Sequence, residues 1–134
     1  KLKHYGISKT NQITTLKLWG SGTPCREFLH VDDMADACIF VMSNVDFTDL
    51  IKDTKEIRNT HINIGTGEDL TIKELASLIK EQVQFKGQIE FDSTKPDGTM
   101  KKLQDVSKLH KLGWKHKVDF TIGIKQVIEW YYDI

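Results

Sequence analysis

The sequence predicts a small mixed α/β fold, a lobe in which short strands and helices alternate along the chain. Three observations support this class. Stretches rich in β-branched residues alternate with amphipathic helical patterns. Clusters of Gly, Pro, Ser and Asp separate these stretches, as turns do. The strands are few and short, so we expect a lobe and not a complete doubly wound nucleotide-binding domain.

Four stretches have the alternating pattern of strands. They are residues 13–19 (ITTLKLW), 26–31 (REFLHV), 61–64 (HINI) and 88–92 (QIEFD). The first two are separated by a predicted loop that contains Gly20, Gly22 and Pro24. Residues 46–60 have mixed charge and little periodicity, and we expect an exposed loop or a short helix there.

Helical patterns follow most of these strands. The first helix is expected behind Asp32 as its N-cap, with apolar positions at Met34, Ala37, Cys38, Val41 and Met42. The second begins with the capping box of Thr71 and Glu74 and extends to residue 83. A short helix capped by Asp105 is expected to end at Leu112 before Gly113, and a last one begins near Thr121 behind Asp119.

Composition limits the possible functions. The 134 residues suggest one domain, and a formal net charge of zero argues against a nucleic-acid partner. No apolar run is long enough to cross a membrane, so we expect no membrane partner. Cys25 and Cys38 lack metal-ligand spacing, and Cys38 is expected to be a small buried residue. This cysteine usage favours a reducing compartment and hence a cytoplasmic location.

The stretch INIGTGEDLT partly matches a dinucleotide-binding fingerprint. The fingerprint needs a third glycine, and Leu70 stands at that position. We therefore expect Gly65 and Gly67 to form a tight turn, with no cofactor and no metal bound. His30 and His61 are expected to be structural, and the adjacent Asp32 and Asp33 to cap a helix. No nucleophile–base pair is evident, so we expect no catalytic residue in this chain.

Arg26 is one of two arginines in a chain with seventeen lysines. An arginine fork suits a phosphate, the flat ring of Trp19 suits a base or sugar, and a carboxylate in the loop STKPDGTMKK can accept bonds from hydroxyls. Together they would suit a nucleoside diphosphate. Each also has a structural alternative: Trp19 in a core, Arg26 paired with Glu27 or covering a helix end, and a solvated turn with surface lysines.

Three stretches carry a family resemblance: WGSGTPCREFLHVDDMADA, HINIGTGEDLTIKELA and FDSTKPDGTMKKLQDVSKLHKLGW. They closely resemble the C-terminal part of the GDP-L-fucose synthase family, which belongs to the extended short-chain dehydrogenase/reductases. The resemblance spans residues 13 to 134. It implies that residues 1–134 form a single C-terminal GDP-sugar binding domain, truncated at its N-terminal side, from which the Rossmann domain is absent.

The resemblance also implies a function. The family epimerises C3 and C5 of GDP-4-keto-6-deoxy-D-mannose and then reduces the C4 ketone with NADPH, which makes GDP-L-fucose. Matching the motifs makes Trp19, Arg26, Asp97 and Lys102 the substrate-binding residues. NADP and the catalytic residues belong to the N-terminal domain, so this chain alone should be inactive. The parent protein is expected to be a homodimer.

Two alternatives stay open at this point. Enzymes with nearly the same C-terminal motifs act on a GDP-4-keto-6-deoxy-heptose, as C4 reductases or as 3,5-epimerases. The chain could also be a non-catalytic module that binds a nucleotide sugar.

Overall fold

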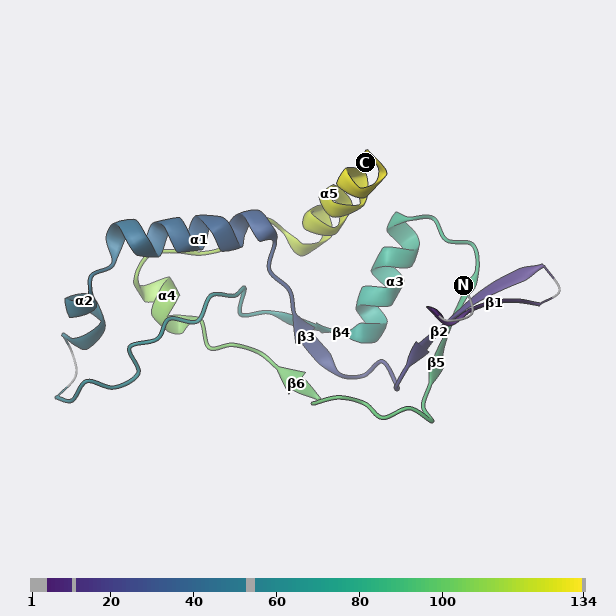
Figure 1. Cartoon of the computed structure of the whole chain (residues 1–134), viewed down its shortest axis with the longest axis horizontal. Helices are drawn as coiled ribbons and strands as arrows, with labels where there is room; N and C mark the ends of the chain where they lie inside the picture. Colours follow the sequence, from purple (N-terminus) through teal and green to yellow (C-terminus); the bar gives the residue numbers. More distant parts are fainter. Residues whose placement is uncertain (1–4, 11, 53–54, 134) are drawn as a thin grey trace. The chain divides into compact units, whose positions relative to one another are not determined.

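The computed structural model describes residues 5–10, 12–52 and 55–133, and its fold is mixed α/β as predicted (Figure 1). The elements in order are β1 (Ile7–Thr10), β2 (Ile13–Trp19), β3 (Cys25–Glu27), α1 (Val31–Asn44), α2 (Phe47–Ile51), β4 (Asp69–Thr71), α3 (Ile72–Gln82), β5 (Gln88–Asp92), β6 (Lys101–Lys102), α4 (Ser107–Lys111) and α5 (Phe120–Tyr132).

The chain forms two compact units. Unit 1 consists of Lys1–Arg26, Asp69–Lys102 and Ile124–Ile134, and unit 2 of Glu27–Glu68 and Leu103–Gly123. Each is described by itself. The expectation that residues 1–134 form one substrate-binding domain stays a prediction.

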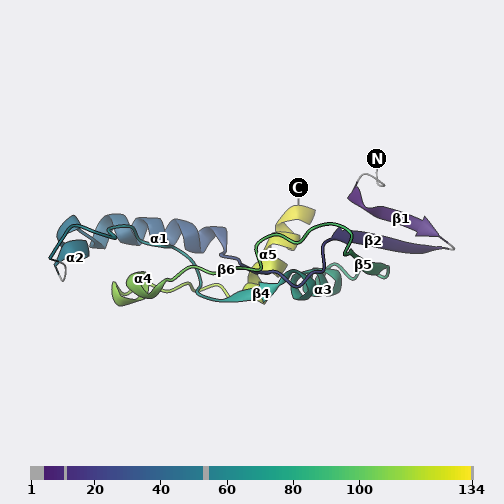
Figure 2. The same cartoon turned by 90° about the horizontal axis from the view of Figure 1, so that it is seen from below.

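Unit 1 contains two small sheets (Figure 2). The first has the order β1-β2-β5, with β1 antiparallel and β5 parallel to β2. The second has the order β4-β3-β6, with β3 parallel to β6. Helix α3 begins with the predicted capping box, in which Thr71 and Glu74 exchange hydrogen bonds. The loop after β2 is tied to this helix start by backbone bonds from Ile72 to Pro24 and from Lys73 to Gly22.

Unit 2 has a small apolar core beneath α1. Ala37, Leu109 and Trp114 are buried, and α4 lies alongside α1 in both views (Figures 1 and 2). The buried carboxylate of Asp33, 3% exposed, accepts the backbone N–H groups of Lys117 (3.0 Å) and Val118 (2.9 Å). A buried carboxylate is stable only when such donors satisfy it, so Asp33 anchors the chain after α4 to the first turn of α1.

Several predictions about the elements are confirmed. Strands form at Ile13–Trp19 and Gln88–Asp92, and a short helix at Phe47–Ile51. Asp119 accepts the N–H groups of Thr121 and Ile122 at the start of α5. The patterns did not predict strand β1.

Other predictions are wrong. Residues 61–64 belong to no strand, because their backbone has no ladder partner among the described residues. The extended stretch 26–31 is shorter than expected, since α1 already begins at Val31. His30 is its N-cap, with Nδ1 accepting the Asp32 N–H at 3.3 Å, so Asp32 is not the cap. Cys38 is exposed, because α1 has too little of unit 2 packed around it to bury a wide apolar stripe.

The Asp33 anchor leads to a stability prediction. Asp33→Asn should lower the free energy of unfolding by about 1–3 kcal/mol, because an amide can accept only one of the two N–H groups and its own N–H₂ group would face the other. Asp32→Asn is the matched control, since the Asp32 side chain is 84% exposed. Urea denaturation followed by circular dichroism would measure both variants. Equal stability of the two variants would contradict the assignment.

Candidate functional site

The four predicted site residues all lie on two segments of unit 1 that run side by side, residues 19–26 and 92–102. Both segments run in the same direction, as Figure 1 shows for the loop between β5 and β6 and the connection between β2 and β3. The pairing begins at Trp19 with Asp92 and ends at Arg26 with Lys102. The structure therefore brings together the two motifs that the sequence separates by more than sixty residues.

Arg26 is partly buried and is held by backbone carbonyls. Its Nη1 atom donates to the carbonyl oxygens of Cys25 (2.6 Å) and Thr99 (2.7 Å). A guanidinium has five N–H donors, and Nη1 supplies two of them. In the part of the chain that the structure describes, Nε and Nη2 have no hydrogen-bond partner. These atoms form the parallel pair of donors that suits a phosphate or carboxylate.

The structure separates two adjacent lysines by their direction. Lys102 is the register partner of Arg26, and Lys101 is that of Cys25. Side chains in register leave a sheet on the same face, and successive residues leave it on opposite faces. Lys102 therefore shares a face with Arg26, whereas Lys101 leaves on the other face. There the Lys101 ammonium pairs with Asp69 at 3.3 Å. Only Lys102 adds charge beside Arg26.

Asp97, in the Pro-Asp-Gly turn, binds Ser21 and so joins residues 92–102 to residues 19–26. One carboxylate oxygen accepts the Ser21 N–H (2.8 Å) and the other accepts the Ser21 hydroxyl (2.7 Å). The hydroxyl and then the backbone N–H of Ser21 hold the pKa of the Asp97 carboxyl below its usual value. Sequence patterns did not indicate Ser21, because it looks like an ordinary turn residue.

Trp19 is not a core residue, because its side chain is 76% exposed. The ammonium of Lys95 lies over its ring, 5.5 Å from the ring centroid. This is the geometry of a cation–π contact. The ring is therefore at the surface of unit 1, at the start of the paired segments.

The glycine turn after residue 64 holds a carboxylate of the chain itself. Glu27 accepts the N–H of Gly67 at 2.7 Å and that of Gln104 at 3.0 Å, and also the Thr66 hydroxyl. A Cβ on Gly65 would collide with the Glu27 carboxylate. A pyrophosphate does not fit this turn, because its space and its N–H donor are taken by a group of like charge. We derive no cofactor chemistry from these residues.

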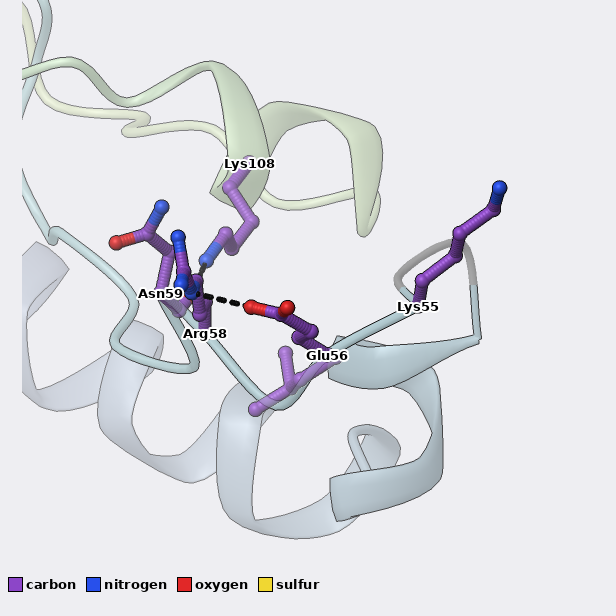
Figure 3. A pocket seen from close by; sticks show the side chains of 6 residues that line it. Lys55, Glu56, Arg58, Asn59 and Lys108 are labelled. Atoms are coloured by element: carbon purple, nitrogen blue, oxygen red, sulfur yellow. Dashed lines mark hydrogen bonds and ion pairs between the residues drawn. The ribbon is translucent and has the colours of Figure 1, made fainter.

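A pocket of unit 2 lies elsewhere and contains none of the predicted residues. It has a volume of about 420 Å³ and is lined by Leu50, Lys55, Glu56, Arg58, Asn59 and Lys108. Figure 3 shows the Arg58–Glu56 ion pair (2.7 Å), with Lys55 pointing away from it. The Lys108 ammonium donates to the carbonyls of Asn59 and His61. Arg58 and Lys108 of this pocket are thus bound by acceptors of the chain itself.

Two other classes of site are absent from residues 5–10, 12–52 and 55–133. No group of three or more His, Cys, Asp or Glu side chains there could hold a metal ion. None of the helices described is both long and apolar enough to cross a membrane.

The fold and these motifs define the class of protein. Residues 4–65 match the model of the NAD dependent epimerase/dehydratase family. A solved structure, a GDP-6-OMe-4-keto-L-xylo-heptose reductase from C. jejuni, matches with a TM-score of 0.89 and 50% identity over 98% of this chain and 36% of that one. The chain is thus similar to proteins of the NAD dependent epimerase/dehydratase family.

Within that class the chain is similar to GDP-L-fucose synthases, which confirms the resemblance of its motifs. It is 47% identical to GDP-L-fucose synthase of Escherichia coli (strain K12), over 97% of this chain and 40% of that protein. It is 44% identical to GDP-L-fucose synthase 1 of Arabidopsis thaliana, over 97% of this chain and 37% of that protein. The chain therefore spans little more than a third of the length of these relatives.

The Asp97–Ser21 contact leads to a prediction for pH. Because the pKa of Asp97 is lowered on folding, its contribution to stability is present above its unfolded pKa and is lost as pH falls through the folded value. Ser21→Ala should raise the pKa of Asp97, since the larger of its two stabilising bonds disappears. Carbon-13 NMR titration of the carboxyl groups would measure this.

Asp92 is the internal control in that titration. Hydrogen bonds from Thr94 lower its pKa, and Ser21→Ala leaves them in place. An Asp97 pKa that is the same with and without the Ser21 hydroxyl would contradict the assignment.

Proposed function

We propose that this chain is the nucleotide-sugar binding part of an NADP-dependent epimerase/reductase that converts GDP-4-keto-6-deoxy-D-mannose to GDP-L-fucose. The substrate-binding residues are Trp19, Arg26, Asp97 and Lys102. The similarity to GDP-L-fucose synthases over 97% of the chain supports the enzyme class.

The observation that carries the proposal is the register of Arg26 with Lys102. This register places the Arg26 guanidinium, with Nε and Nη2 atoms that bind no described residue, and Lys102 on one face of the sheet. The same two segments pair again at Trp19, where β2 lies beside β5. Two adjacent cations match the charge of a diphosphate, and an exposed aromatic ring can stack on a base or a sugar. The Asp97 loop contributes to the same site.

The rest of the reaction belongs to parts of the enzyme beyond these residues. The isomerase steps at C3 and C5, the hydride transfer from NADPH, and the binding of NADP are assigned to an N-terminal domain. The solved GDP-mannoheptose C4 reductase MlghC from Campylobacter jejuni contains bound NADP, and it is 47% identical to this chain over 37% of its own length. A homodimeric parent and a cytoplasmic location remain predictions, and the isolated chain is expected to be inactive.

A reductase acting on a GDP-linked heptose is the second candidate. It is favoured by solved heptose-modifying enzymes that are 47% to 50% identical to this chain. The Arg26 and Lys102 face would hold the diphosphate in either case. Consumption of NADPH by the full-length enzyme with each GDP-4-keto sugar in turn would separate the two candidates. No turnover of either sugar, together with no GDP binding, would contradict the proposed function.

Arg26→Ala in the full-length enzyme should weaken GDP binding by about 2–4 kcal/mol, because a charge-assisted phosphate contact is lost. Arg26→Lys should also weaken it, since an ammonium cannot supply two parallel N–H groups. The control is Arg58→Ala, which removes the chain's other arginine, 76% exposed and paired with Glu56. Calorimetry with GDP would measure all three; wild-type affinity in Arg26→Ala would exclude the phosphate role.

The two neighbouring lysines allow a second test. Lys102→Ala should weaken GDP binding roughly tenfold, because it removes a cation on the Arg26 face. Lys101→Ala should leave GDP affinity close to wild type, since its ammonium pairs with Asp69 on the opposite face. Calorimetry in low and high salt would compare them. Equal losses from both variants would show that only general positive charge matters at this site.

A further inference from the structure

Between their two ladder pairs, the paired segments 19–26 and 92–102 are joined by a small number of hydrogen bonds, and several of these involve side chains. Between the ladder pair Trp19–Asp92 and the ladder pair Cys25–Lys101, side chains take part in the bonds from Ser21 to Asp97 and from Arg26 to Thr99. Backbone bonds from Gly20 to Asp92 and from Cys25 to Met100 close the two ends of this interval. The Arg26 anchor at Thr99 lies two residues beyond Asp97. The Thr99 carbonyl therefore lies between two fixed points, the Ser21–Asp97 contact on one side and the Cys25–Met100 backbone bond on the other.

The turn at residues 20–23 provides hydrogen-bond donors and space for the Asp97 carboxylate. The single hydroxyl hydrogen of Ser21 goes to Asp97, so the Thr23 hydroxyl must donate to the Ser21 oxygen, at 2.7 Å. The Thr23 N–H also donates to that oxygen, at 3.1 Å. Gly20 has φ +82°, and a Cβ there would collide with a carboxylate oxygen of Asp97. Both the donors and the space of the turn thus accommodate Asp97.

We propose that Asp97 is a positioning residue, which acts through Ser21 to keep Arg26 and Lys102 on one ligand face. Each of its oxygens accepts one hydrogen bond from Ser21, and this contact holds residues 95–102 beside residues 19–26. When this contact is lost, the Thr99 carbonyl moves away from the Arg26 guanidinium, and the fork loses one of its two anchors. The inference rests on the proposed function and assigns Asp97 a defined part in it.

Three variants of the full-length protein test this with GDP as the probe in calorimetry. Asp97→Ala removes both bonds and should weaken GDP binding about tenfold. Ser21→Ala removes only the hydroxyl bond, leaves the sequence of residues 92–102 unchanged, and should weaken GDP binding severalfold. The double variant should bind GDP no more weakly than Asp97→Ala, because both changes break the same contact. Asp97→Asn should retain most of the affinity, since its amide can accept the Ser21 N–H and donate to the Ser21 oxygen.

Ser93→Ala is the control for Ser21→Ala, because Ser93 is an exposed serine in the loop that contains Asp97. This variant should bind GDP like wild type. An Asp97 that acts through contact with the ligand alone would give a different pattern. Ser21→Ala would then leave GDP affinity unchanged while Asp97→Ala weakens it. Either that pattern or wild-type affinity in Asp97→Ala would overturn the proposal.

A measurement without ligand separates this proposal from the proposed function. The side-chain N–H signals of Arg26, observed by nitrogen-15 NMR in the ligand-free protein, should shift in Asp97→Ala and in Ser21→Ala, and stay in place in Ser93→Ala. If wild-type protein fails to bind GDP while these shifts occur, the proposed function fails and the positioning role of Asp97 for Arg26 holds. Unshifted Arg26 signals in Asp97→Ala would overturn the positioning role, whatever the affinity for GDP.

Discussion

The parallel pairing of Arg26 with Lys102 is the constraint on which the candidate site depends. It is a backbone register, and it determines which side chains share a face. A shift of one residue would place Lys101 beside Arg26 and turn Lys102 to the opposite face of the sheet. The short strands β3 and β6 cannot hold such a register by length alone. Side-chain contacts on the adjoining segments therefore have to support it.

Within each unit, carboxylates tie together segments that are distant in the sequence. Asp97 in unit 1 accepts two donors of Ser21, while Glu27 and Asp33 in unit 2 each accept two backbone N–H groups. Bonds to a charged acceptor are stronger than neutral ones, and an acceptor bridging distant segments ties them at one point. These acidic residues would be easily taken for catalytic groups. Their hydrogen bonds assign them to holding loops in place.

In the proposed site, carboxylates hold loops in place and cations are left to contact the ligand, which agrees with the proposed binding of a nucleotide sugar. Backbone carbonyls hold the Arg26 guanidinium, and the strand register places Lys102 on the same face. Their geometry is therefore defined before a ligand binds. Preorganised donors lose less entropy on binding than flexible ones. The GTG turn, which partly resembles a cofactor fingerprint, is filled by Glu27 and serves the fold of unit 2. The proposed redox chemistry is accordingly placed outside these residues.

Local chemistry made parts of the molecule predictable from sequence. The α/β class, the strands at 13–19 and 88–92 and the Thr71–Glu74 capping box depend on neighbouring residues, so their patterns sufficed. The motifs also determined the family resemblance and the choice of Arg26 and Lys102. Only tertiary structure decided that residues 61–64 form no strand, that Cys38 is exposed and that Trp19 lies at the surface. It alone joined Asp97 to Ser21, because ladder partners, burial and contacts between distant segments depend on what the rest of the chain brings alongside.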